Sequence, residues 1–169
     1  MKMKVTGLKT LLQVTAVISI IGVCSIAQAA MVVNLSVNGS EDKLEITTHG
    51  NCSSNNTNGC LKVTGNELIN FVLTQKQCSA GGKWSLSTVT LGTVENGAGG
   101  LDPQVAKDFD ANATSGLVTP ESSNDSHIQI RDDNTVPSVV YYTVTATCPG
   151  MDPINSDPRI INDGTGNPP

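Results

Sequence analysis

Aromatic side chains are scarce in this sequence, because Trp84, two tyrosines and two phenylalanines are the only ones among 169 residues. Basic residues are also few, with 10 lysines and arginines against 15 acids and a formal net charge of −5. A surface with this balance repels the phosphate backbone, so nucleic acid is excluded as a partner. The 38% of hydrophobic residues still suffices for one globular domain.

Residues 1–29 have the three parts of a secretory signal. Lys2, Lys4 and Lys9 form a basic start, Leu11 to Ile26 are largely apolar, and Ala27-Gln28-Ala29 supplies the small residues of a cleavage site. The apolar run is short and interrupted for a membrane span; a retained N-terminal anchor is the alternative. No second long apolar run follows. We therefore expect cleavage before Ala30 and a single exported domain, residues 30–169, that is periplasmic or extracellular and does not contact the membrane.

Four cysteines follow the signal segment: Cys52, Cys60, Cys78 and Cys148. An even number of cysteines in an exported chain predicts two disulfides, with three possible pairings. We favour one bond between Cys52 and Cys60 and a second between Cys78 and Cys148. A zinc site is the alternative, but it needs further ligands at short spacing, and only His49 is near.

Alternating hydrophobicity predicts β-strands along most of the chain. The clearest strand is Val139 to Cys148, where apolar residues recur at every second position. His127 to Arg131 repeats this pattern, and Asp132 to Thr135 between the two segments predicts a hairpin turn. Further strands are expected at Met31–Val37, Lys43–Thr48, Cys60–Thr64, Leu68–Gln75 and Trp84–Val94.

Together these segments predict an all-β fold, an immunoglobulin-like β-sandwich of about seven strands with one short helix, stabilised by disulfides. Within Trp84–Val94 the inward positions change parity, so we expect a β-bulge near Ser87-Thr88. Asp102 followed by Pro103 predicts the start of the helix, with Val105, Ala106 and Phe109 on its buried side. The Asn-, Ser- and Thr-rich segment Asp110 to Asp125 should be a surface loop.

Few residues could support catalysis. A hydrolase needs a nucleophile and an oriented base, and His49 and His127 are the only imidazoles. No serine lies in a Gly-x-Ser-x-Gly motif, and no spacing among the acids singles out a catalytic carboxylate pair. We therefore expect a protein without enzymatic activity and without a cofactor.

Two features could bind ligands. Asp132, Asp133 and Asn134, with Asn124 and Asp125, offer oxygen atoms to a calcium ion, although the simpler interpretation is that they build a turn. Trp84 could stack on a sugar ring, but a lone tryptophan in a small sandwich more often belongs to the core.

The C-terminal part resembles the small bacterial DP-EP family, which is named for an Asp-Pro and a Glu-Pro dipeptide. The similar stretches are residues 128–135, Val140-Tyr141-Tyr142-Thr143-Val144 and Asp157-Pro158-Arg159-Ile160-Ile161-Asn162. The chain has no Glu-Pro, and Asp163-Gly164 stands where one would be expected. The resemblance implies a small β domain without assigned catalysis, and it supplies no functional residues.

The end of the chain distinguishes two classes of function. Arg159-Ile160-Ile161 should dock along a sheet edge as a short protecting strand; alternatively, this segment is donated to a neighbouring molecule. In the first case the protein is a binding or surface module that recognises an unknown protein or glycan through its Asn-, Ser- and Thr-rich loops. In the second it is a pilin-like or matrix subunit that assembles by strand exchange.

Overall fold

The computed structural model describes residues 30–38, 43–48, 50–52, 58–74, 77–93, 100–112, 115–156, 158–162 and 164–165. The predicted signal segment 1–29, His49 and Asp157 lie outside these ranges. Within them no helix is long and apolar enough to cross a membrane.

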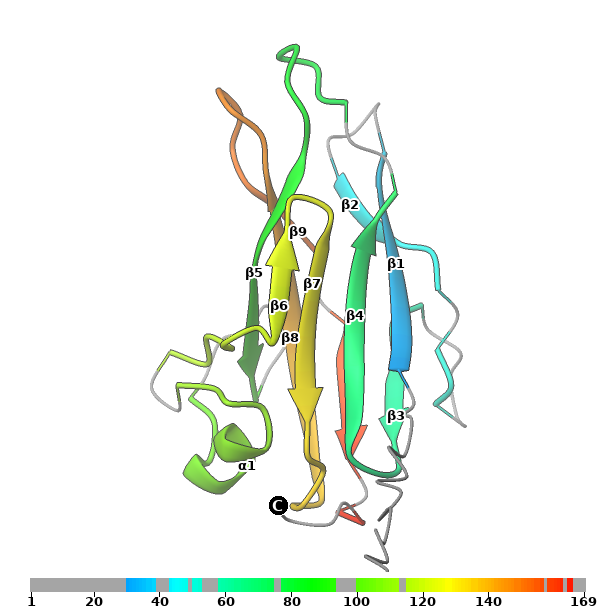
Figure 1. Ribbon diagram of the computed structural model, residues 1–169, viewed down its shortest axis with the longest axis vertical. Coiled ribbons are helices and arrows are strands. Elements are labelled where there is room, and N and C mark those ends of the chain that lie inside the picture. The colour runs from blue at the N-terminus through cyan, green and yellow to red at the C-terminus, as the bar shows by residue number, and fades with distance from the viewer. Residues whose placement is uncertain are drawn as a thin grey trace, which may run out of the picture.

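The described residues form ten strands and one short helix (Figure 1). In chain order the elements are β1 (Ala30–Asn38), β2 (Lys43–Ile46), β3 (Leu61–Val63), β4 (Glu67–Leu73), β5 (Ser85–Gly92), α1 (Pro103–Asp108), β6 (Ser122–Asn124), β7 (His127–Asp132), β8 (Ser138–Thr147), β9 (Ile154–Ser156) and β10 (Arg159–Asn162).

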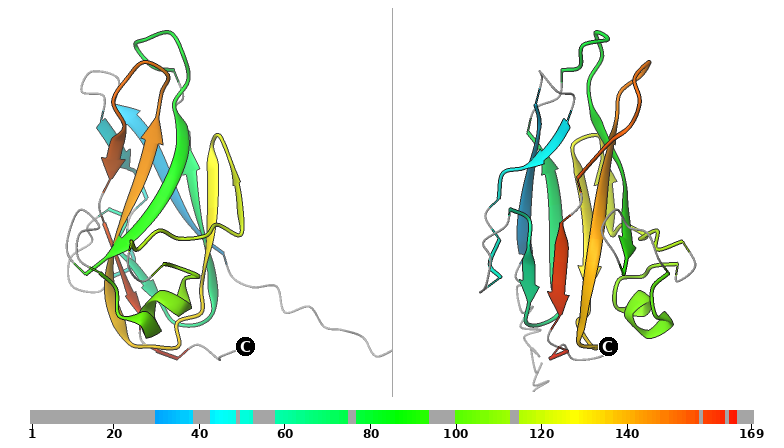
Figure 2. Two further views of the ribbon diagram at one scale, coloured as in Figure 1. Left: turned by 90° about the vertical axis from the view of Figure 1, so that its left-hand side faces the viewer. Right: turned by 180° about the vertical axis from the view of Figure 1, so that it is seen from behind.

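The strands form two sheets that face each other across the core (Figure 2). Sheet A has the order β2-β1-β4-β7-β6, and sheet B has the order β3-β10-β8-β5, with β9 also paired to β8. The all-β class is therefore confirmed. The finer immunoglobulin-like arrangement is not, because β1 pairs with β4, and β3 with β10, in parallel, whereas the sheets of that fold are antiparallel.

The prediction of a hairpin turn at residues 132–135 is wrong, because β7 belongs to sheet A and β8 belongs to sheet B. The Asp108 carboxylate at the end of α1 holds this crossover. It accepts hydrogen bonds from the backbone N–H groups of Thr135 (3.1 Å) and Val136 (3.0 Å), and from the Thr135 hydroxyl. These bonds turn the chain between the sheets, where a hairpin would have kept both strands in one sheet.

The core contains most of the aromatic side chains. Trp84 is 1% exposed, so it belongs to the core and does not offer a surface for stacking a sugar. Phe71 of sheet A packs against Tyr142 of sheet B with ring centroids 5.3 Å apart. The Tyr142 hydroxyl donates a hydrogen bond to the Gly59 carbonyl (2.7 Å), and burial raises the pKa of this phenol.

Two local predictions are confirmed. The register of β5 against β8 shifts between Leu86 and Thr88, where the bulge was expected. The helix begins at Pro103, and the Asp102 side chain accepts a hydrogen bond from the Gln104 N–H (2.8 Å). Part of the expected loop 110–125 has strand pairing instead: β6 pairs with β7, and Leu117 forms a β-bridge with Thr90 of β5.

The loop segment around Gly116 covers the edge of β5. The Leu91 N–H donates to the Gly116 carbonyl (2.8 Å), and the Val118 N–H donates to the Val89 carbonyl (3.1 Å). Gly116 has a φ of +66°, and a Cβ atom here would collide with the carbonyl oxygen of Leu91. Only glycine fits this close approach of two backbones.

The C-terminal strand β10 docks within its own chain, but not at a sheet edge. It lies between β3 and β8, and its residue Ile160 is 0% exposed, while Ile161 is partly exposed. In the view from behind, β10 runs beside β8 (Figure 2). The expected edge strand is therefore an interior strand, because β3 pairs with its other side.

The edge of sheet B on this side is β3, and a side chain occupies its outer backbone groups. The Lys62 N–H donates to Asn51 Oδ1 (2.5 Å), and Asn51 Nδ2 donates to the Lys62 carbonyl (3.1 Å). The amide thus occupies the backbone groups that a further strand would use, which protects the edge from pairing with another chain.

The four cysteines pair as favoured, with bonds from Cys52 to Cys60 and from Cys78 to Cys148. The first joins residues eight positions apart, and Cys60 immediately precedes β3. The second ties the end of β8 to the turn before β5. Two disulfides indicate an oxidising environment.

Candidate functional site

The outer face of sheet A has an array of polar side chains on its central strands. Strand alternation turns Asn70 of β4 and His127, Gln129 and Arg131 of β7 away from the core. Asn70 lies opposite Gln129 in register, and β1 places Val32 on the other side of Asn70. These half-buried and exposed side chains form a surface that we call the sheet A face.

Two side chains of this face, His127 and Gln129, converge on the side-chain oxygen of Asn70. Asn70 Oδ1 lies 2.9 Å from His127 Nε2 and 2.7 Å from Gln129 Nε2. Because Gln129 donates here and an amide oxygen only accepts, the His127 bond requires a proton on Nε2; in the neutral imidazole, Nδ1 is then an acceptor. Asn70 Nδ2 and Gln129 Oε1 make no hydrogen bond within the described part of the chain. One unused donor and two unused acceptors therefore lie close together.

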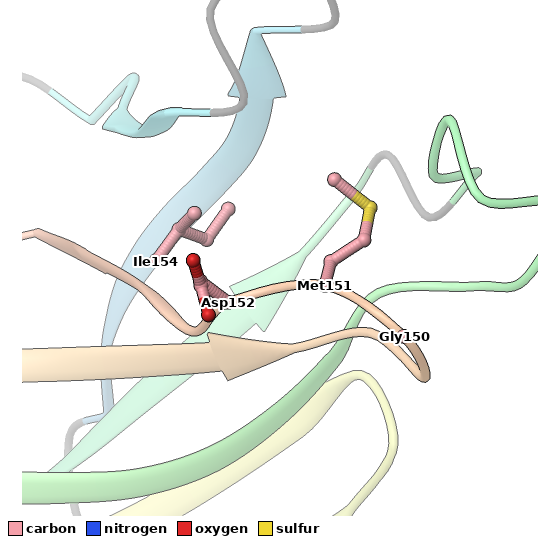
Figure 3. Close-up of a pocket in the computed structure, with 4 residues that line it drawn as sticks. All are labelled: Gly150, Met151, Asp152 and Ile154. Carbon is pink, nitrogen blue, oxygen red and sulfur yellow. The ribbon is translucent and has the colours of Figure 1, made fainter.

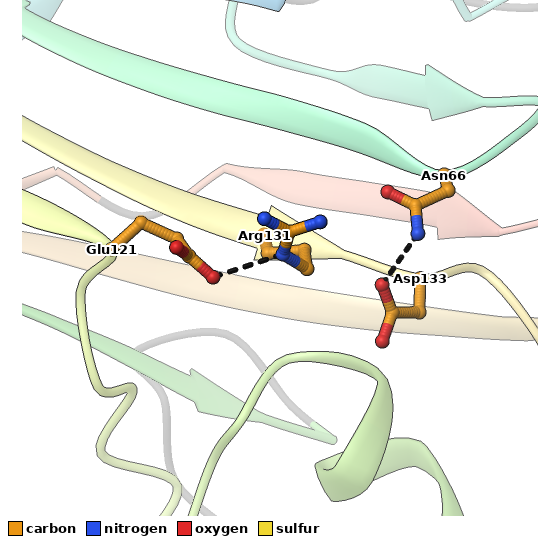
Figure 4. Close-up of polar contacts among 4 residues, drawn as sticks. All are labelled: Asn66, Glu121, Arg131 and Asp133. Atoms are coloured by element: carbon orange, nitrogen blue, oxygen red, sulfur yellow. Dashed lines mark hydrogen bonds and ion pairs between the residues drawn. The ribbon is translucent and has the colours of Figure 1, made fainter. Parts of the chain in front are cut away.

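Beyond this amide cluster of Asn70, His127 and Gln129, charged groups follow on the outer face at the Asp132 end of β7. Figure 4 shows two of their contacts. Arg131 Nε lies 2.9 Å from Glu121 Oε1, and Asn66 Nδ2 donates to Asp133 Oδ1 (2.7 Å). The hydrogen bond and the charge of Arg131 lower the pKa of Glu121, and the hydrogen bond to Glu121 raises the pKa of Arg131. Partial burial raises the pKa of Asp133.

The Glu121–Arg131 pair should contribute little to stability. Both side chains are about one-third exposed, so Glu121→Gln is expected to lower the free energy of unfolding by less than about 1 kcal/mol. The loss should shrink in high salt, and it should also shrink as the pH falls from 4.5 through the lowered pKa of Glu121 in the folded protein. Urea unfolding measures this loss. The matched control is Glu45→Gln, because Glu45 of β2 accepts a hydrogen bond from Asn38 of β1. A loss of several kcal/mol would contradict a screened surface pair.

The structure does not bring the calcium candidates together. Asp132 points into the core, and Asp133 points to the outer face, where it binds Asn66. Asn134 accepts from the Gly164 N–H (2.9 Å) and donates to the Val63 carbonyl (3.3 Å). Asn124 and Asp125 lie at the opposite end of β7. Among the described residues, no three histidine, cysteine or acidic side chains form a group that could hold a metal ion.

A hollow of about 610 Å³ lies beside the β8–β9 hairpin, lined by Gly150, Met151, Asp152 and Ile154 (Figure 3). The Ser79 hydroxyl lies 3.5 Å from the Met151 sulfur and joins the hairpin to the neighbouring turn. Asp152 is the ionisable group of this lining. The hollow therefore offers apolar contact and one carboxylate, but not the paired groups that acid–base catalysis requires.

The sequence did not predict the amide cluster. His127 was considered as a catalytic base, but Asn70 and Gln129 were not singled out, because polar residues on the outward positions of strands are ordinary. The signal that could have found them is the pairing of β4 with β7, which places Asn70 opposite Gln129.

Comparison with known proteins shows no matching family model and no similar curated protein. The resemblance of the C-terminal stretches to the DP-EP family thus stays a prediction. Of the Asp-Pro dipeptide that the resemblance uses, Pro158 is among the described residues and Asp157 is not. The site must therefore be interpreted from its own chemistry.

Proposed function

We propose that the protein is an exported, non-catalytic binding module that recognises a glycan through the sheet A face. The observation that carries this proposal is the convergence of His127 and Gln129 on Asn70 Oδ1. These bonds hold the side chains in one arrangement and leave donor and acceptor groups side by side. Sugar hydroxyls both donate and accept, so neighbouring hydroxyls of a sugar ring are complementary to such an array.

The charge of the chain agrees with a neutral, hydroxyl-rich ligand. After removal of the signal segment, seven basic residues face 15 acids, which gives a net charge of −8. Such a surface repels anionic polymers. This proposal moves the binding surface from the loops, which the sequence favoured, to the sheet. Part of those loops, including residues 53–57, lies outside the described residues.

The contacts of His127 favour binding over catalysis. A general base is usually hydrogen-bonded to a nucleophile on one side and to a carboxylate on the other. His127 Nε2 instead binds an amide oxygen. The other histidine, His49, lies outside the described residues.

The alternative, a pilin-like subunit that assembles by strand exchange, receives less support. A strand that serves a neighbour must leave an open groove in its own sandwich. β10 is already paired on both sides, with β3 and β8 of the same chain. Its docking in cis therefore favours a monomeric binding module.

A glycan microarray with the purified exported protein tests the proposal. We expect selective binding to a group of glycans, and at least about tenfold weaker binding after Asn70→Ala, because the change removes a ligand contact and the acceptor that orients His127 and Gln129. Asn155→Ala is the matched control, since Asn155 is an exposed strand residue of sheet B that binds Thr145. Binding that survives Asn70→Ala, or no binding by the wild type, would contradict the proposal.

A further inference from the structure

Asp132 and Asn162 join the two sheets at one end of the core. Asp132, the last residue of β7, is 0% exposed, and Asn162, the last residue of β10, is 4% exposed. Asn162 Nδ2 donates to Asp132 Oδ1 (3.1 Å), which also accepts from the Asn134 N–H (2.9 Å). One oxygen of the carboxyl group therefore has two donors.

The two remaining oxygens of this pair have none. Asp132 Oδ2 and Asn162 Oδ1 are both buried without a hydrogen-bond partner among the described residues. Leaving a buried acceptor without a donor is unfavourable. When an amide and a carboxyl group meet in one plane, the amide that donates to one carboxyl oxygen has its own oxygen beside the other carboxyl oxygen. A proton on Asp132 Oδ2 would convert that atom into the missing donor for Asn162 Oδ1.

The surroundings of Asp132 favour the protonated acid. Burial raises the pKa of Asp132 from 3.8 to about 8, against the opposing effect of the hydrogen bonds from Asn134 and Asn162. The negative charges of Asp108 and Asp133 raise it further, and Glu67 is the cross-strand neighbour of Asp132 on β4. The nearest cation in sequence, Arg131, points to the outer face and pairs with Glu121.

We propose that Asp132 and Asn162 form a reciprocal carboxylic acid–amide pair, which acts as a proton-dependent latch on the C-terminal strand β10. In the closed state each side chain donates one hydrogen bond to the other. When the proton leaves to solvent, a buried carboxylate oxygen faces the amide oxygen without a donor between them. The end of β10 then loosens, while Ile160 still anchors the middle of the strand in the core.

The direction of the pH dependence follows from proton linkage. Between about pH 4 and pH 8 the folded protein holds a proton on Asp132 that the unfolded chain has lost. In this range the Asp132 contribution raises the unfolding equilibrium constant by about tenfold per pH unit, and the contribution becomes constant above pH 8. The latch is thus closed in acidic and neutral surroundings and opens in alkaline ones.

Three measurements on the purified exported protein test the latch. Carbon NMR of the Asp132 carboxyl should show titration well above pH 6. Hydrogen exchange of the Asn162 amide should accelerate beyond the ordinary base-catalysed rate above pH 8, compared with amides of β7. Urea unfolding from pH 5 to pH 9 compares the wild type with Asp132→Asn, which supplies a permanent donor to Asn162 Oδ1. The ratio of the wild-type unfolding constant to that of Asp132→Asn should rise by about tenfold per pH unit up to pH 8.

Asp133→Asn is the matched control, because it removes the neighbouring carboxylate on the outer face but keeps Asp132. It should keep the slope of about tenfold per pH unit between pH 5 and pH 7, and this slope should end at a slightly lower pH because the charge of Asp133 no longer raises the pKa of Asp132. The proposal is overturned if Asp132 titrates below pH 5, or if Asp132→Asn keeps the wild-type slope. It is also overturned if sodium or calcium at constant ionic strength stabilises the wild type but not Asp132→Asn, because the unpartnered oxygens would then hold a cation. If Asp132→Asn fails to fold, the NMR titration and the exchange of Asn162 in the wild type still decide the question.

Discussion

Ile160→Ala is expected to lower the free energy of unfolding by about 2–5 kcal/mol, because it removes a fully buried side chain from an interior strand. The matched control is Ile161→Ala. Ile161 is the next residue of β10, but it points to the outer face of sheet B and is partly exposed. We expect this change to cost less than about 1 kcal/mol. Urea unfolding of both variants measures the difference.

Equal losses at Ile160 and Ile161 would show that β10 does not dock in the register described. Deleting residues 159–169 extends the test. Without β10 the residues Ser138–Tyr141 of β8 lose their neighbouring strand on that side, and β3 loses the strand with which it pairs. The deletion should therefore melt at a lower temperature and aggregate. A deletion variant that melts like the wild type, but no longer self-associates in light scattering, would instead support strand donation to a partner.

Removing the Cys78–Cys148 bond is expected to cost about 4 kcal/mol, against about 2.5 kcal/mol for Cys52–Cys60. The difference follows from the sequence separations of 70 and 8 residues, because the longer cross-link removes more conformational entropy from the unfolded chain. The double variants Cys78→Ala/Cys148→Ala and Cys52→Ala/Cys60→Ala serve as controls for each other.

Thermal unfolding without reductant compares these variants with the wild type. The reduced wild type should be less stable than either variant, since it lacks both bonds. A larger loss for the Cys52–Cys60 variant would mean that the native contacts around β3, including the amide bonds of Asn51 to Lys62, depend on the short bond. Entropy of the unfolded chain would then not be the main effect.

Features that depend on neighbouring residues could be predicted from the sequence. The alternation in Val139–Cys148 predicted a strand that the structure places at Ser138–Thr147. Asp102 and Pro103 marked the start of the helix, and the change of parity after Leu86 marked the bulge. Each of these signals is local, because strand pleat, helix capping and bulges are determined by side chains only a few residues apart.

The candidate site could not be predicted in the same way. His127 was recognisable as an outward strand residue, but its contact with Asn70 spans 57 positions. The pair of Asp132 and Asn162 likewise requires that β7 and β10, from different sheets, end at the same place. The turn residues 132–135 suggested a hairpin, whereas the chain crosses to the other sheet, with the Thr135 and Val136 N–H groups bound to the distant Asp108 carboxylate.

The sequence by itself determined that this is an all-β protein with a light aromatic core, an acidic surface and two disulfides. These properties follow from composition and from the two-residue period of a strand, which each segment carries on its own. Only the tertiary structure decided the strand order, the interior position of β10 and the meeting of Asn70 with His127 and Gln129. Strand pairing joins distant segments through backbone groups that are alike in every residue, so its partners depend on how the whole core packs.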